Sequence, residues 1–256
     1  MRQVTLVAFY GQKPETIARL ITECQNTVAQ YFPAFTPYDI RQVHATIIGL
    51  ERLPGGFYNR NLSDHRGKRR AMDMRGFQDF LRRTGHIPFA VQIGGFQDRD
   101  YSFTSRGQRP RTRSFSIQGD KAVVMGWPLR GEPAPGAPDT FTLVQEIRRY
   151  PHNLDDIRHS AQAFNILHLW HEHPTDIDND FYFRIGQFLS RPVQDAVDQA
   201  EDKLRRFLEH RGPLVVEVGI SDLCFVGYEE GDETLPIDRT QKIQLEDGGD
   251  PLKLFG

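Results

Sequence analysis

The chain has 256 residues, of which 38% are hydrophobic and 26% charged, and its formal net charge is −2 at pH 7. A chain of this length can bury a substantial core, either as one large domain or as two closely packed lobes. Its small net charge excludes a global attraction to nucleic acid or membranes, so any site for a polyanion must be local. The sequence has no signal-peptide pattern, and no uncharged apolar run in it approaches the roughly 18 residues of a membrane span. Its two cysteines, Cys24 and Cys224, suit neither a disulfide framework nor a metal site. We therefore expect a cytoplasmic protein with buried, reduced thiols.

Strand and helix patterns alternate through the first half of the chain. Residues 3–10 (QVTLVAFY) predict a strand, and Pro14 begins a helix that runs to about residue 31 with apolar side chains at core spacing. A β-branched run at 43–50 predicts a buried strand. Beyond it we expect a helix at 71–83, a strand at 88–96 and an exposed loop at 101–112.

The second half continues the mixed pattern. Residues 113–118 and 121–127 predict a hairpin that turns at Gly119-Asp120, a dipeptide typical of tight turns. The Pro/Gly stretch at 131–138 is the clearest hinge in the chain. We expect helices at 140–150, 154–171 and 192–210, strands at 181–188, 214–218, 222–228 and 242–245, and a frayed tail beyond 247.

These elements predict an α+β fold with a sheet in each half, the two sheets facing each other across a groove. The hinge divides residues 1–256, taken as a single domain, into lobe one at about 1–130 and lobe two at about 139–247. Residues 248–256 then form a tail.

Each half carries one His-x-Thr tripeptide, His44-Ala45-Thr46 and His173-Pro174-Thr175. Residues two apart on a strand point to the same face, so His44 and Thr46 are expected side by side. One imidazole can take a proton from an attacking oxygen and a second can give one to the leaving oxygen, while the hydroxyls donate to phosphate oxygens. The pair therefore predicts metal-free phosphoester chemistry, with a buried, inert histidine as the alternative for His44.

Basic residues gather in two local runs. Residues 66–70 read RGKRR, and residues 99–113 contain five arginines. Arg109, Arg111 and Arg113 are the candidates for contacts with substrate phosphates. The alternative is a solvated loop and a helix start without a ligand.

The order of the elements gives a further indication. Residues 3–50 contain a predicted strand, a helix and the first His-x-Thr. The next predicted strand begins at Pro88-Phe89 and ends at Gly94-Gly95-Phe96, and the strand after it is preceded by Arg109-Pro110-Arg111. Late in the chain, a helix is followed by Asp222-Leu223-Cys224-Phe225-Val226. Over most of its length the chain resembles the 2H phosphoesterase superfamily, which includes the 2′-5′ RNA ligase-like and cyclic phosphodiesterase-like proteins. The resemblance implies two pseudo-symmetric lobes, each a mainly antiparallel sheet with helices outside, that face across a central cleft. Each lobe would place one His-x-Thr/Ser motif on a central strand.

The second motif departs from that pattern. In the family, apolar residues follow the motif at once, whereas here five mostly acidic residues follow and the apolar run begins at Phe181. Pro174 also removes a backbone donor, which disfavours a central strand position. Two placements stay open besides an inert site: His173 and Thr175 line the cleft from the loop before the strand, or the cleft face belongs to Asp178, Asp180, Tyr182 and Arg184.

Residues 168–180 also contain ligand types that divalent metals accept. His168 and His171 share a face if the preceding helix extends that far, and His173, Glu172 and Asp176 lie close by in sequence. The spacing matches no standard zinc motif. We therefore expect Leu167 and Trp170 to face the core, and His168 or His171 to cap an element or line the cleft.

The sequence predicts a metal-independent phosphodiesterase, a hydrolase acting on RNA 2′,3′-cyclic phosphate, 2′-5′ linkages or a cyclic (oligo)nucleotide. His44 and His173 would be the acid/base pair, Thr46 and Thr175 would hold the phosphate, and Tyr182 with Arg109, Arg111 and Arg113 would bind substrate. No cofactor, metal, membrane or obligate protein partner is expected. The alternatives are a non-catalytic nucleotide- or RNA-binding module of the same fold, and a metal-dependent hydrolase with His168, His171, Asp178 and Asp180 as its second half-site.

Overall fold

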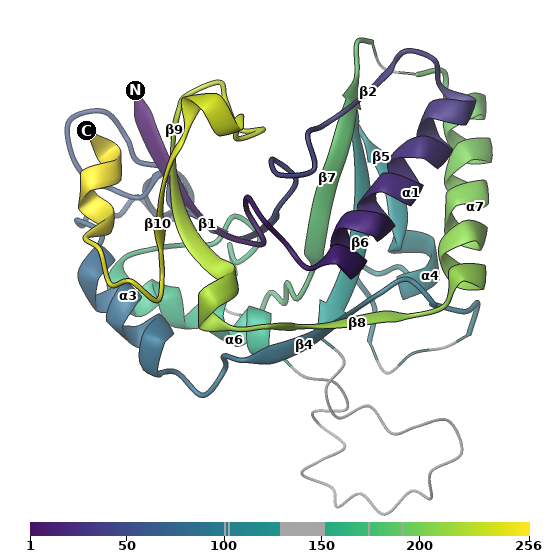
Figure 1. Cartoon of the computed structure of the whole chain (residues 1–256). Coiled ribbons are helices and arrows are strands. Elements are labelled where there is room, and N and C mark those ends of the chain that lie inside the picture. Colours follow the sequence, from purple (N-terminus) through teal and green to yellow (C-terminus); the bar gives the residue numbers. More distant parts are fainter. Residues whose placement is uncertain (100, 102, 129–151, 174, 191) are drawn as a thin grey trace, which may run out of the picture.

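The computed structural model describes residues 1–99, 101, 103–128, 152–173, 175–190 and 192–256 (Figure 1). The strands in this part of the chain are β1 (Arg2–Ala8), β2 (Phe35–Pro37), β3 (Ala45–Gly49), β4 (Phe89–Ile93), β5 (Phe115–Gln118), β6 (Lys121–Pro128), β7 (Phe181–Phe188), β8 (Leu214–Val218), β9 (Leu223–Glu229) and β10 (Gln241–Gln244). They form one sheet in the order β10-β9-β1-β3-β7-β6-β4-β8, with β2 on β7 and β5 on β6. The strand pairings are antiparallel, and β3 and β7 are neighbours at the centre.

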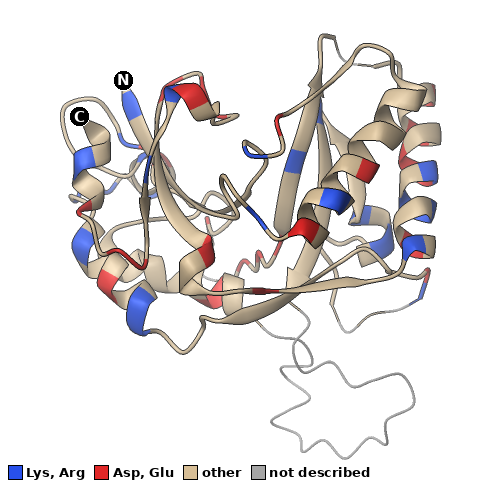
Figure 2. Cartoon of the chain, in the orientation of Figure 1, with Lys and Arg blue, Asp and Glu red and all other residues tan. Residues whose placement is uncertain are grey.

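The helices of the described residues are α1 (Glu15–Tyr31), α2 (Arg60–Arg66), α3 (Met74–Arg83), α4 (Pro110–Arg113), α6 (Asn153–Ser160) and α7 (Gln194–Arg211), with 3-10 turns at Ala161–Phe164, Ile220–Asp222, Ile237–Arg239 and Pro251–Phe255. Helices α1 and α7 lie side by side at one end of the sheet (Figure 1), where Arg211 Nε donates to Glu23 Oε2 over 2.6 Å. Helix α3 and the C-terminal turn lie at the other end. Figure 2 shows acidic and basic positions interspersed along α3 and α7, in keeping with the small net charge.

Apolar spacing explains the two long helices. In α1, Ile17, Leu20 and Cys24 are buried at intervals of three and four residues, as an amphipathic helix on a core requires. In α7, Ala200 and Leu204 repeat this spacing, and Gly212 follows the last helical residue. Both helices agree with the sequence prediction to within two residues.

Most predicted strands are also confirmed. The hairpin consists of β5 and β6, with Gln118 paired to Lys121 and Gly119 at a φ of 64°, a left-handed conformation that glycine adopts without strain. The expected strand at 181–188 is β7, and the last three predicted strands are β8, β9 and β10. The short strand β2 was not predicted, because no strand was expected between the helix that ends at about residue 31 and the run at 43–50.

Two local predictions are wrong. The helix expected over 154–171 ends at Ser160, because a 3-10 turn leads to Asn165 in the left-handed conformation (φ 61°), and the Leu167 amide donates to Asn59 Oδ1 (3.1 Å) instead of to a helical carbonyl. The tail is not frayed, because the Pro251–Phe255 turn packs on the sheet, with Leu254 3% exposed.

The fold class is α+β with a large antiparallel sheet and helices, as expected at that level. The strands of both halves join one sheet, however, and not the two facing sheets that were expected, because β3 pairs with β7. The hinge predicted at 131–138 and the helix at 140–150 lie outside the described residues. Both cysteines are buried free thiols, as predicted. Within the described part of the chain, every helix is too short or too polar to cross a bilayer.

Arg158 of α6 fastens the two central strands to each other. Its side chain is 0% exposed. The guanidinium donates to the carbonyls of Ile47 (2.8 Å), Asp178 (2.8 Å), Thr46 (3.2 Å) and Asp180 (3.2 Å), and lies 3.5 Å from the Asp178 carboxylate. One buried cation therefore fixes β3 against the segment that leads into β7, which sets the position of the site described next.

Candidate functional site

The pairing of β3 with β7 creates a four-residue constellation. Ala45 lies opposite Phe183 in an antiparallel register, so the residues on either side of this pair point to the opposite face of the sheet. Those residues are His44 and Thr46 on one strand and Tyr182 and Arg184 on the other, and all four line one pocket of about 300 Å³. The remaining lining residues are Thr5, Gly49, Glu51, Arg60, Asn61, His168, Leu169, Trp170, Tyr228, Glu233 and Leu235.

His44 is held as a neutral ring with one nitrogen free for a ligand. Its Nδ1 lies 2.7 Å from the Gln42 carbonyl, which accepts a proton and so fixes the tautomer with the lone pair on Nε2. Burial lowers the pKa of His44 to about 4. The hydrogen bond to Gln42 raises this pKa, and the charges of Arg184 and Lys13 lower it further. The ring of Tyr10 packs edge-on at 5.9 Å and fixes its orientation.

Arg184 supplies positive charge opposite His44. Among the described residues its guanidinium forms no ion pair within 4.0 Å and lies 5.7 Å from the centre of the Tyr182 ring. Its charge adds to the hydrogen bond from Lys121 in lowering the pKa of Asp120. Thr46 and Tyr182 add two hydroxyl groups to the same pocket. A cation, two hydroxyls and an imidazole lone pair together suit a phosphate group better than a neutral ligand.

The far end of the pocket has a different character. Tyr228 donates its hydroxyl proton to Glu51 Oε1 over 2.9 Å, and burial raises the pKa of Glu51. Arg60 there binds Glu230 at 2.7 Å. Sequence reasoning missed these residues, although Glu51 follows the His44 strand directly and was the available signal.

His168 also lines this pocket, as one of the sequence alternatives allowed. Its Nε2 lies 2.8 Å from Asp178 Oδ2. Burial lowers the pKa of His168 to about 4, the Arg158 charge adds to the effect, and Asp178 opposes it. Trp170 was expected in the core but is 47% exposed at the pocket rim, under the Arg106 guanidinium at 3.7 Å, whereas Leu167 is buried as expected.

The alternative second half-site built on Asp178 and Asp180 does not form. Asp178 is buried and bound to His168 and Arg158, and these partners lower its pKa although burial alone would raise it. Asp180 accepts from Trp127 Nε1 (2.7 Å), Ser105 Oγ (2.6 Å) and Arg113 (3.1 Å). Neither carboxylate lines the pocket, so only Tyr182 and Arg184 of that set face it.

The arginines expected to bind substrate are bound to carboxylates of the chain itself. Arg113 is mostly buried against Asp180, Arg111 binds Glu209 at 3.0 Å, and Arg109 binds Asp98 at 2.9 Å. None of the three lines the pocket. Their placement corrects the expectation, because Arg113 binds Asp180 just before β7, Arg111 binds α7 and Arg109 binds the nearby Asp98.

The structure does not bring His173 and Thr175 to the pocket. Both are exposed, in a turn where the His173 amide donates to Asp176 Oδ2 over 2.7 Å. The turn points outward because the preceding helix ends at Ser160 and not near residue 171.

His171 meets two side chains that the sequence reasoning missed, Asp155 and His159 of α6. Their spacing of four residues, Asp-x-x-x-His on one helix face, was the signal that could have found them. Neither His168 nor Asp178 belongs to this group, so the metal ligands suggested by the sequence are not brought together as a set.

Comparison with known proteins adds one structure. No family model and no curated protein matches the chain. Among solved structures, the crystal structure of TT0787 of Thermus thermophilus is similar with a TM-score of 0.40 and 13% sequence identity, over 95% of this chain and 94% of that one.

Proposed function

We propose that the pocket binds an RNA-type phosphodiester, a 2′,3′-cyclic phosphate, a 2′-5′ linkage or a cyclic (oligo)nucleotide, and cleaves it with His44 as the general base. One observation carries this proposal: the His-x-Thr of β3 faces the Tyr-x-Arg of β7 in a single pocket. The proposal includes the two-lobed, cytoplasmic 2H-like design expected from the sequence, with Tyr182 and Arg184 in place of the second His-x-Thr.

The phosphate would lie between the two strands. Arg184 provides a charged donor with no carboxylate partner among the described residues, and the Thr46 hydroxyl provides a second donor from the opposite strand. Hydrogen bonds from a guanidinium to phosphate are roughly twice as strong as neutral ones. Donors on two fixed strands need no rearrangement as charge develops on the phosphorus oxygens.

His44 is suited to accept the proton of the attacking oxygen. Its ring is neutral at pH 7 and its Nε2 lone pair is the nitrogen not bound to Gln42. A bound phosphodiester would bring negative charge next to the ring and raise the pKa of His44. The base would then hold a proton more strongly with substrate bound than without it.

Tyr182 would give a proton to the leaving oxygen. The new P–O bond forms to water or a ribose hydroxyl whose proton goes to His44, and the old P–O bond breaks as the Tyr182 hydroxyl protonates the departing oxygen. Tyr182 and Arg184 lie on either side of Phe183 along β7, so both side chains point to the same face of the sheet. The two groups can therefore contact opposite sides of one phosphate. This scheme replaces the two-histidine pair expected from the sequence.

A binding module without catalysis is the second candidate. It is favoured by the same Tyr182, because a phenol releases its proton far less readily than an imidazolium. Such a module would hold a nucleotide or RNA end through Arg184 and Thr46 and leave it intact.

An RNA ending in a 2′,3′-cyclic phosphate, with EDTA present, separates the candidates. We expect turnover by the parent protein, a loss on the order of a hundredfold or more in His44→Ala, and weaker binding in Arg184→Met. His173→Ala is the matched control, because its exposed ring lies outside the pocket. Equal rates for His44→Ala and the parent would reject the base assignment.

The same assay identifies the other two functions. Binding that depends on Arg184 without any turnover would select the binding module. Turnover that appears only after a divalent metal is added, in protein whose circular dichroism and melting temperature are unchanged by EDTA, would select the metal-dependent hydrolase and reject the proposal. Tyr182→Phe should lower the turnover rate and leave binding unchanged, which a purely structural role would not do.

A further inference from the structure

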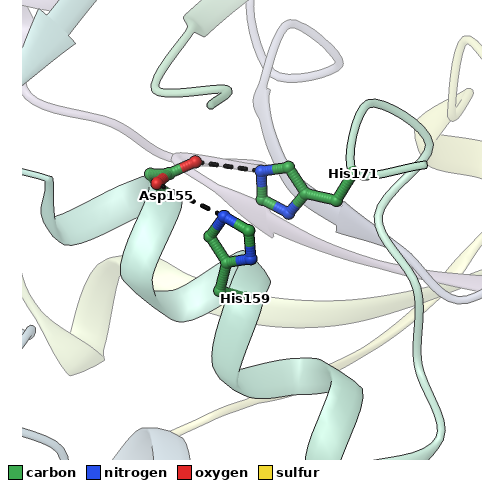
Figure 3. Close-up of side chains that lie close together, drawn as sticks. All are labelled: Asp155, His159 and His171. Atoms are coloured by element: carbon green, nitrogen blue, oxygen red, sulfur yellow. Dashed lines mark hydrogen bonds and ion pairs between the residues drawn. The ribbon is translucent and has the colours of Figure 1, made fainter. Parts of the chain in front are cut away.

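Away from the pocket, three metal-ligand side chains converge on one point (Figure 3). Asp155 and His159 come from α6, and His171 comes from the segment after it. The distance from His171 Nε2 to Asp155 Oδ1 is 2.9 Å, and that from His159 Nε2 to Asp155 Oδ2 is 3.6 Å. One donor atom from each residue lies within 4.8 Å of the others. We call these residues the Asp155–His159–His171 cluster.

Local structure holds the cluster in place. Asp155 and His159 are four residues apart on α6 and therefore share a face. The turn after Ser160 brings His171 back over that face, where its ring stacks on His159 with centroids 3.9 Å apart. The backbone therefore brings the donors together, whereas the two rings, 8° from parallel, must turn about their side-chain bonds for both nitrogen lone pairs to point at one ion.

Hydrogen bonds satisfy the His171 nitrogen that faces Asp155 and leave the other nitrogen of the same ring without a partner among the described residues. His171 is 0% exposed, and its Nδ1 has no hydrogen-bond partner among the described residues. A buried polar atom without a partner costs free energy. The Asp155 carboxylate has the imidazoles of His171, His159 and His152 within 4 Å, and it accepts hydrogen bonds from His171 and from the Asp178 amide.

We propose that the Asp155–His159–His171 cluster is a Zn²⁺ site. Two imidazole nitrogens and one carboxylate oxygen are donors typical of zinc, whereas Mg²⁺ and Ca²⁺ prefer oxygen ligands only. Donors around a tetrahedral ion at about 2.0–2.1 Å lie roughly 3.3 Å from one another. His171 Nε2 is 2.9 Å from Asp155 Oδ1 and His159 Nε2 is 3.6 Å from Asp155 Oδ2, so each imidazole is near that spacing from one oxygen of the carboxylate. The Asp176 carbonyl, 2.9 Å from His159 Nε2, or a water would be the fourth ligand.

The ion would be structural. None of the three ligands lines the pocket, so it would not touch a substrate there. It would fasten α6 to the segment that carries His168 and Trp170, both of which line the pocket wall. This role does not depend on whether the pocket acts on a phosphodiester.

Untagged full-length protein, treated with chelator and titrated with Zn²⁺ alone, tests the proposal. We expect one equivalent of bound zinc by elemental analysis and a rise in melting temperature of about 5–10 °C at a free Zn²⁺ concentration 100-fold above Kd. Co²⁺ in its place should give the visible absorption of a site with nitrogen and oxygen ligands. Absence of stoichiometric binding would overturn the proposal.

Two variants locate the site. His171→Ala risks misfolding because the ring is fully buried, so His159→Gln and Asp155→Asn are preferred, and the half-exposed His159 is the safer of the two. Both should lose the zinc equivalent and the melting shift. His173→Ala, an exposed histidine two residues from His171, should keep them. Equal zinc binding by His159→Gln and the parent would place the metal elsewhere and overturn the assignment.

Discussion

Replacing Arg158 by methionine tests what holds the central strands together. Methionine keeps much of the side-chain length but leaves four backbone carbonyls without their donor and the Asp178 carboxylate without a buried cation. Removal of one partner from a buried ion pair costs about 3–5 kcal/mol, because the other charge stays buried and unpaired. Since a folded domain is stable by only about 5–15 kcal/mol, Arg158→Met should lose a large part of its free energy of unfolding.

Urea unfolding followed by circular dichroism measures this loss. With a slope near 3 kcal/mol per molar urea, the midpoint should fall by about 1–1.7 M. Arg206→Met is the control, because Arg206 forms an exposed ion pair with Asp202 along α7 and should cost under about 0.5 kcal/mol. A loss below about 1 kcal/mol in Arg158→Met would refute the view that this side chain fastens β3 to the start of β7.

Three further outcomes are expected. Because the pKa values of His44 and His168 are lowered in the folded protein, the unfolded chain takes up protons first as the pH falls below 6.5. The free energy of unfolding, measured with urea, should therefore fall by about 1–2 kcal/mol for each of these histidines between pH 7 and pH 5. The fall should be smaller in His44→Gln, which lacks one of the two. Leu254→Ala should cost about 2–4 kcal/mol in the same assay, whereas a frayed tail would cost nothing. Trp127→Phe removes a donor to Asp180 and should cost about 1–3 kcal/mol, and a neutral effect would contradict the buried network.

Residues within one strand were predictable because a strand has a fixed alternation. His44 and Thr46 were expected on one face, and both line the pocket. Tyr182 and Arg184 were recognised as one possible cleft-facing pair by the same rule. The pairing of β3 with β7, which joins the two halves of the site, depends on contacts far apart in sequence and is not contained in either local pattern.

Helix boundaries limited the prediction of the second half-site. The residues after Ser160 keep a helical apolar pattern, so the sequence favoured a helix through His171. The chain leaves that helix because Asn59, in a distant segment, accepts the Leu167 amide. The course of this segment, and not a local pattern, therefore decides where the three histidines lie. His168 lines the pocket, His171 belongs to the Asp155–His159–His171 cluster, and His173 is exposed on the surface.

The alternation rule also failed in an informative way at Asp178 and Asp180. Counting back from Tyr182 places both carboxylates on the cleft face, but β7 begins only at Phe181, and the residues before it follow Arg158 and Arg113 into the interior. Their burial removes two negative charges from the strand face that Tyr182 and Arg184 present. Arg184 and the neutral His44 then share the pocket with Thr46 and Tyr182, while the carboxylates that do line it are Glu51, which accepts from Tyr228, and Glu233. Under the proposed function, the phosphate would therefore lie at the Arg184 side of the pocket.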